Sequence, residues 1–173
     1  HREIMEKAKL DGLERILILE DDAVLLDSWE NSLVSLEAAM TELEKHDKDW
    51  KYLTVGSFLM NSKSLGNNLR EVHCACGTAA YVANLNNFEG VKDYGTTNTI
   101  YLDFEMFCPG PLRFDKAGVS NLFLNTFSNR RTNKHVYSLQ KPVFMPDNSA
   151  QSEIGHLESM FWNIQTEKTM GLS

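Results

Sequence analysis

Three adjacent carboxylates, Glu20, Asp21 and Asp22, are the residues of this chain best suited to chemistry. They directly follow Ile16-Leu17-Ile18-Leu19, a continuous aliphatic run that predicts a strand buried on both faces in a mostly parallel sheet. Open α/β sheets bind ligands at the carboxyl ends of such strands. Because the charges repel one another and offer hard oxygen ligands, we expect Mn²⁺ or Mg²⁺ there, together with substrate phosphates. The alternative is a solvated acidic loop that caps the next helix, although Asp27 is better placed for that role.

A strand that ends in acidic residues and leads into a helix also opens the phosphorelay receiver domains. Such a domain needs a phosphate-accepting aspartate at the end of a later strand, about 40 residues on. The strand ending at Val55 continues instead into Gly56, and no aspartate lies between Asp49 and Asp93. The missing aspartate argues against a receiver domain, which we keep as the signalling alternative.

The segment from Leu17 to Ala23 resembles the signature of the family 25 glycosyltransferases, which include lipopolysaccharide and lipooligosaccharide sugar transferases and the collagen galactosyltransferases. Further resemblances follow in the family's order: the strand end at 53–56, Gly77-Thr78-Ala79-Ala80-Tyr81-Val82, Leu102-Asp103 and Ser152-Glu153-Ile154. His1 and the helix-like segment after it look like the family's Ser-His step. The chain departs from the family at Ala79, where histidine is usual, and at Glu153, where aspartate is usual.

The resemblance implies an α/β fold of the GT-A type, a Rossmann-like mixed sheet flanked by helices. It implies inverting transfer of a hexose, such as galactose, from a UDP-sugar to a hydroxyl of a glycan, lipopolysaccharide-type or protein-linked acceptor. Family members carry a nucleotide-binding β-α-β portion before the Ser-His step, so we expect this chain to lack that portion and to bind UDP poorly. A catalytically inactive relative that only binds glycans is a further alternative.

The resemblance also assigns roles to the acidic residues and their neighbours. Glu20 and Asp22 would bind the metal ion, and His156 would be an extra ligand unless it is a surface histidine. The residues expected around the donor nucleotide are Glu20, Asp21, Gly56, Gly77 and Thr78.

Asp103 is the candidate general base. It ends the apolar run Ile100-Tyr101-Leu102 as Asp21 and Asp22 end theirs, which predicts the same rim of the sheet but a separate strand. An inverting transfer needs a carboxylate near the acceptor hydroxyl and away from the metal. Glu105 is the next candidate, and the alternative for Asp103 is a helix cap.

Other polar and aromatic residues have a structural explanation beside a functional one. His73, Cys74 and Cys76 could be zinc ligands, but their spacing favours packing. The only basic cluster would suit an anionic acceptor, a donor diphosphate or a membrane surface, and is otherwise a solvated loop; it comprises Arg130, Arg131, Lys134 and His135. The aromatic residues that could stack on sugars, but for which core packing is favoured, are Tyr81, Tyr101, Phe104 and Trp162.

Periodicity predicts the elements that would position these residues within one α/β domain spanning 1–173. We expect strands over 15–19, 52–55, 78–82, 136–139 and 143–145, and an apolar approach to Asp103 over 100–103. We expect helices up to Leu10, from about Trp29 to His46, over 85–94 and over 154–164, with a surface loop over 61–68.

The composition of the chain limits which binding partners and which cellular compartment we expect for the protein. The formal charge of −7 disfavours nucleic acid, and no apolar stretch reaches the roughly 20 residues that span a bilayer. The chain shows neither a transmembrane segment nor a signal peptide. Three cysteines, an odd number, favour a reducing compartment, so we expect a cytoplasmic protein, with peripheral contact to the inner face of a membrane as one reading.

Overall fold

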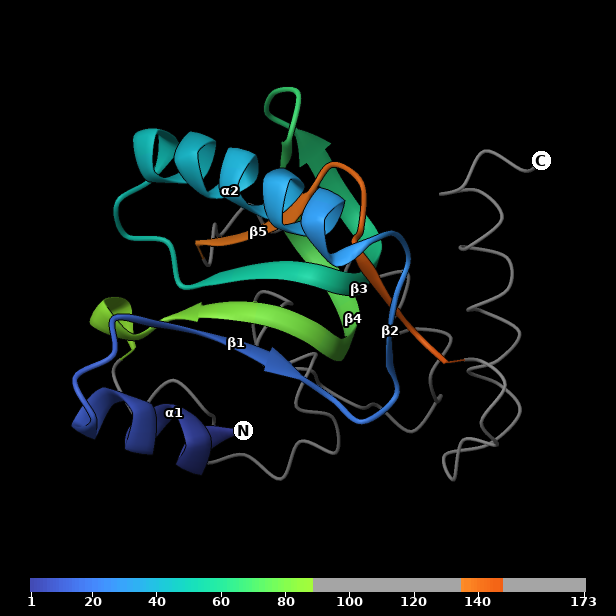
Figure 1. The fold of residues 1–173 in the computed structure, drawn as a ribbon. Coiled ribbons are helices and arrows are strands. Elements are labelled where there is room, and N and C mark those ends of the chain that lie inside the picture. The colour runs from blue at the N-terminus through green and yellow to red at the C-terminus, as the bar shows by residue number, and fades with distance from the viewer. Residues whose placement is uncertain (89–134, 148–173) are drawn as a thin grey trace, which may run out of the picture.

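The computed structural model describes residues 1–88 and 135–147 (Figure 1). In chain order the elements are α1 (Arg2–Leu10), β1 (Arg15–Leu19), β2 (Ala23–Leu25), α2 (Trp29–His46), β3 (Tyr52–Ser64), β4 (Leu69–Asn84), the 3₁₀ helix η1 (Leu85–Asn87), β5 (Val136–Leu139) and β6 (Phe144–Pro146). The strand expected near 100–103 and the helix over 154–164 lie outside the described residues. Of the helix expected over 85–94, the described part is only the 3₁₀ turn η1, which ends at Asn87, and Phe88 after it is extended.

The described strands form two sheets. The larger sheet has the order β1-β4-β3-β5, and β2 pairs with β6 in a second, two-stranded sheet. Strand β5 pairs parallel with β3 and antiparallel with the start of β4, so the larger sheet is mixed. A mixed α/β architecture is confirmed at this coarse level.

The expectation that β1 lies in a mostly parallel sheet is wrong for the described residues. Strand β1 pairs antiparallel with β4, with Leu17 opposite Val82, and only the β3–β5 pair is parallel. An aliphatic run reports that both faces of a strand are covered, and it carries no information on strand direction. Ile18 packs into one hydrophobic cluster and Leu17 against another, on opposite faces. The predicted burial on both faces holds for only part of β1, because Leu19 is 46% exposed.

Strands β3 and β4 form a long antiparallel hairpin. The surface loop predicted over 61–68 is therefore wrong for 61–64, which belong to β3. Strand β3 runs on to Ser64, and the turn is closed by a hydrogen bond from the Leu65 amide to the Leu69 carbonyl (3.0 Å). The pairing is irregular around Asn61, where the register shifts on both sides. Such bulges let a polar segment remain in a strand although its composition resembles a loop.

Each face of the larger sheet is covered by one helix. Met5 and Ala8 of α1 pack against Tyr52 and Ile18 on one face. On the other face α2 packs against the cluster that contains Leu53 and Leu139. Because successive strand residues point to opposite faces, Tyr52 and Leu53 belong to different clusters. Figure 1 shows α1 and α2 on either side of the strands.

Helix α2 begins and ends close to the predicted residues. Its N-cap is Ser28, whose hydroxyl accepts a hydrogen bond from the Asn31 amide (3.2 Å), while the Asp27 carboxylate accepts from the Ser28 amide (2.6 Å). The cap is therefore Ser28 and not Asp27, which the sequence favoured and which instead binds the amide of the cap residue. Within the described ranges neither helix is long and apolar enough to cross a membrane.

Candidate functional site

Glu20 lies beside the Gly77-Thr78 segment because β1 and β4 pair there. The Glu20 amide donates to the Ala79 carbonyl (2.8 Å), which extends the ladder one residue past β1. The Glu20 carboxylate accepts a hydrogen bond from the Thr78 hydroxyl. Two residues that the sequence assigned to one site, Glu20 and Thr78, are therefore in direct contact.

His1 is a second partner of Glu20 and was not predicted as a site residue. Its Nε2 lies 3.2 Å from Glu20 Oε1, and its Nδ1 lies 2.8 Å from the Tyr81 hydroxyl. The His1 ring stacks on Tyr81 with centroids 5.8 Å apart. Tyr81 is fully buried, so the packing explanation of this tyrosine holds. The only sequence signal for His1 was the resemblance to the Ser-His step.

Asp22 occupies a different environment from Glu20. Its Oδ1 is buried and has no hydrogen-bond partner among the described residues, and Asp21 beside it is exposed. Burial raises the pKa of the Asp22 carboxyl above its usual 3.8, and the negative charge of Glu20 raises it further. An ionised carboxylate with an unsatisfied buried oxygen is costly unless a cation or a donor reaches it.

Asp147 completes the acidic cluster from a distant part of the chain. Its amide donates to the Asp22 carbonyl (2.7 Å) at the end of the β2–β6 pair, and its charge also raises the Asp22 pKa. Asp147 was not predicted, although a carboxylate directly after the apolar strand at 143–145 was a signal of the same kind as the triplet itself. The acidic cluster is Glu20, Asp21, Asp22 and Asp147.

The geometry suits a cation that takes few protein ligands. Within the part of the chain that the structure describes, no group of three or more His, Cys, Asp or Glu side chains is arranged to hold a metal ion. One Glu20 oxygen is already held by Thr78 and His1. Asp22, by contrast, has a free buried oxygen, and Mg²⁺ and Mn²⁺ typically use one or two carboxylates with waters and substrate phosphates. Asp22 therefore fits the expected metal and Glu20 fits a supporting role better.

The two glycines expected near the nucleotide have structural constraints of their own. A Cβ on Gly56 would lie 2.9 Å from the Phe144 Cβ and 3.1 Å from the Ala80 Cβ, so the glycine lets β6 pack against the hairpin. Gly77 has a φ of 83°, a left-handed conformation that glycine adopts without strain. Its carbonyl accepts a hydrogen bond from the Ser57 hydroxyl (2.6 Å).

Most of the remaining candidate residues lie outside the part of the chain that the structure describes. Asp103, Glu105 and His156 lie outside them, as do the basic residues Arg130, Arg131 and Lys134 and the aromatic residues Tyr101, Phe104 and Trp162. His135 does not act as part of a solvated loop, because its Nδ1 lies 2.7 Å from an Asp47 oxygen. The zinc alternative at 73–76 stays a prediction.

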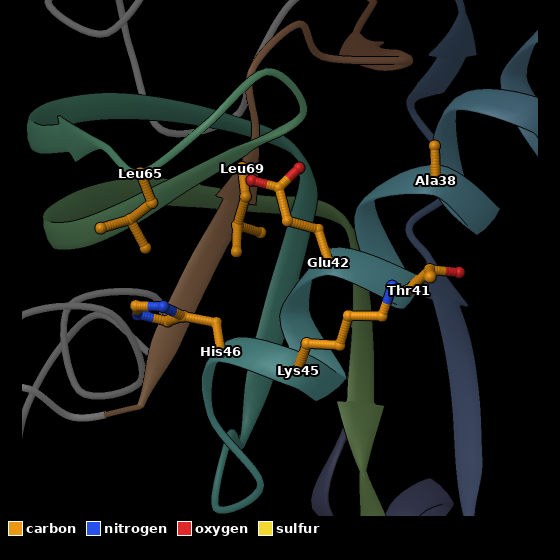
Figure 2. A pocket seen from close by; sticks show the side chains of 7 residues that line it. All are labelled: Ala38, Thr41, Glu42, Lys45, His46, Leu65 and Leu69. Atoms are coloured by element: carbon orange, nitrogen blue, oxygen red, sulfur yellow. The ribbon is translucent and has the colours of Figure 1, made fainter.

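A cavity of about 510 Å³ lies away from the acidic cluster, between α2 and the β3–β4 turn (Figure 2). Figure 2 shows Leu65 and Leu69 of the turn facing Glu42 and His46 of the helix. None of its lining residues belongs to the predicted site.

Comparison with known proteins adds no family assignment, because no family model, curated protein or solved structure matches the chain.

Proposed function

We propose that this chain is a metal-dependent, inverting glycosyltransferase of the GT-A type that uses a UDP-hexose as donor. The observation that carries the proposal is the partnerless buried oxygen of Asp22 within an acidic cluster at the end of β1. A bound divalent cation would neutralise this carboxylate, and such a cation commonly completes its coordination with the phosphates of a substrate. The resemblance of 17–23 to the family 25 signature gives the donor class, a UDP-sugar, and the acceptor class, a carbohydrate or glycolipid hydroxyl.

Asp22 and Glu20 of the acidic cluster would bind different parts of the metal–donor complex. Asp22 would hold Mn²⁺ or Mg²⁺ through its free oxygen. Glu20, fixed by Thr78 and His1 through one carboxylate oxygen, has a second oxygen with no hydrogen bond or ion pair to the described residues, and this oxygen would accept a hydrogen bond from a ribose hydroxyl. When bound, the metal ion would offset the negative charge that develops on the departing nucleoside diphosphate.

Asp103 would take the proton from the acceptor hydroxyl as that oxygen attacks the anomeric carbon. The attack comes from the face opposite the diphosphate, so the base must be separate from the acidic cluster. Glu105 is the second candidate for this role, and His156 is a candidate for an additional metal ligand.

The test is UDP release from UDP-galactose and UDP-glucose with Mn²⁺ present, with and without neutral oligosaccharide acceptors. We expect release by the unchanged chain at donor concentrations high enough to offset its expected weak UDP binding, loss on chelation, and loss in Asp22→Asn. Asp103→Asn should lower turnover by about 10²–10⁴-fold with donor binding intact. Asp11→Asn, which changes an exposed carboxylate paired with Lys7, is the matched control and should be unaffected.

Two outcomes separate this proposal from its alternatives. Release that is unchanged in a folded Asp22→Asn variant would exclude Asp22 as the metal ligand. Binding of sugars without any turnover by the unchanged chain would favour a catalytically inactive glycan-binding relative. The receiver-domain alternative receives no support from the fold, because β1 has an antiparallel neighbour and β3 continues through Gly56 and Ser57 without an aspartate.

A further inference from the structure

A second pocket lies at the opposite end of the β2–β6 pair from Asp22. It measures about 370 Å³, within the usual size range of small-molecule sites, and is bordered by the end of β2, the first half of α2, the β3–β4 turn and the loop between β5 and β6. Its polar lining consists mainly of amides and hydroxyls: Asn31, Ser32, Ser35, Asn67, Asn68 and Gln140. One acidic residue, Asp27, and one basic residue, Lys141, contribute opposite charges, so the pocket carries no net charge.

Ser32 is the least expected residue in this lining. It is 4% exposed, and its hydroxyl has no hydrogen-bond partner among the described residues. Helical Ser and Thr hydroxyls commonly bond the carbonyl four residues back. Ser35 and Thr41 of the same helix do so, at 3.0 and 2.9 Å. A buried hydroxyl without a hydrogen bond lowers the free energy of unfolding, and an alanine at this position would avoid that penalty.

The walls of the pocket are fixed in place by hydrogen bonds that leave other polar groups free. The Glu42 carboxylate of α2 accepts from the backbone and side-chain amides of Asn68 (3.3 and 3.2 Å). The Asn68 carbonyl in turn accepts from the Gln140 amide (2.8 Å). Within the described residues, Gln140 Nε2, Asn68 Oδ1 and Lys141 Nζ make no hydrogen bond or ion pair and remain available. Donors and acceptors are therefore both presented from a preorganised frame.

We propose that this pocket binds one hexose unit of a neutral glycan. A sugar ring offers hydroxyls that both donate and accept, which matches amides and hydroxyls better than it matches a charged lining. The apolar walls, which include Leu26 and Pro142, can face the ring's C–H groups. A phosphorylated ligand fits poorly, because Lys141 is the only cation in the lining and Asp27 opposes it.

The position of the pocket relates it to the acidic cluster. Strand β2 connects Asp22 to Leu26, a span of at most about 14 Å in extended chain. This separation suits a sugar unit of the acceptor that is bound away from the reacting hydroxyl. The assignment to an acceptor rests on the proposed function, whereas the sugar site itself does not.

The experiment is a titration of the labelled chain with millimolar galactose, glucose and lactose, followed by amide chemical shifts, without metal or UDP. We expect shifts concentrated at 31–35, 67–68 and 139–143. Ser32→Ala should weaken sugar binding by about two- to tenfold, the value of one neutral hydrogen bond, while its melting temperature stays equal or rises. Gln140→Ala should also weaken binding. Thr41→Ala removes a similar hydroxyl outside the pocket and should leave binding unchanged.

Several results would overturn the proposal. These are the absence of sugar-induced shifts, shifts centred elsewhere, or binding that neither Ser32→Ala nor Gln140→Ala weakens. Shifts in the pocket caused by triglycine and not by sugars would assign it to peptide backbone. A titration with Mn²⁺ and UDP on the same samples keeps the two proposals apart, since loss of sugar binding with normal metal and UDP binding contradicts only the pocket.

Discussion

At Asp22, burial and the charge of Glu20 both raise the carboxyl pKa above 3.8. A raised pKa means that the folded chain holds this proton more tightly than the unfolded chain. The stability that Asp22 contributes is therefore complete below about pH 3.8 and is lost as pH rises through the folded-state pKa. The ionised carboxylate at neutral pH is a cost to folding that a bound cation would relieve.

This cost predicts that Asp22→Asn is more stable than the unchanged chain at neutral pH, in the absence of divalent metal. Thermal melts from pH 3 to pH 8 should show the two curves together at the acid end (about pH 3) and apart above the folded-state pKa (by about pH 8). Mn²⁺ should raise the melting temperature of the unchanged chain only. A less stable Asp22→Asn at neutral pH would show that the carboxylate is satisfied by other groups.

Single residues were predictable where a side chain's type and place in the chain define its role. The resemblance placed Glu20 and Thr78 in one site, but the hydrogen bond between them was not predicted. Asp147 was missed because its neighbour Asp22 is 125 residues away in sequence, and only the β2–β6 pairing brings the two together. His1 could not be assigned a partner, since a histidine at a helix start does not indicate which strand it meets.

Among the elements, the end of α2 is tied to the start of β5 by Asp47. Burial raises the Asp47 pKa, but hydrogen bonds from His135 and Tyr137 (both 2.7 Å) outweigh it, so the pKa falls below 3.8. The stability from a lowered pKa is present above the unfolded-state value and is lost as pH falls through the folded-state value.

We therefore expect Asp47→Asn to lower the free energy of unfolding by about 1.5–3 kcal/mol at neutral pH, the range for hydrogen bonds to a charged group. The difference should vanish at the acid end of the pH range. Tyr137→Phe, which removes one of the two bonds, should show a smaller loss. Denaturant unfolding of the three proteins at several pH values is the measurement, and equal stability of Asp47→Asn and the unchanged chain would contradict the role of this contact.

Packing of β6 on the hairpin depends on Gly56. Gly56→Ala should cost about 1–3 kcal/mol, because the new Cβ meets the backbone and Cβ of Phe144. The control is Gly66→Ala, whose Cβ would meet the Glu42 carboxylate and no backbone atom; it should cost less, because that carboxylate can move at the expense of its hydrogen bonds to Asn68. If Gly56→Ala and Gly66→Ala are both as stable as the unchanged chain, Gly56 has no packing role, and a ligand must explain its place in the site.

Elements were easier to predict than their pairing. Helix α2 and strands β1 and β5 begin and end close to the predicted residues, because periodicity and capping are local signals. Strand β2 was not predicted, since three residues that follow an acidic triplet read as a loop. The extension of β3 through polar residues was also missed, because bulges relax the alternation on which strand prediction depends.

For the whole molecule, sequence indicated an α/β chain but not its sheet order. The antiparallel partner of β1 follows from contacts between segments about 60 residues apart, which no local pattern encodes. The consequence for function is that the acidic triplet is framed by β4 on one side and by the β2–β6 pair on the other. The two proposed sites then lie at opposite ends of β2, one suited to a metal-bound donor and one to a sugar.

The most direct test of a metal site at Asp22 is paramagnetic broadening of amide signals by substoichiometric Mn²⁺ in the presence of UDP. The predicted result is broadening centred on 20–23, 78–79 and 147, lost in Asp22→Asn and kept in Asp11→Asn. Broadening that is absent, that centres on another part of the chain, or that persists in Asp22→Asn would contradict the account.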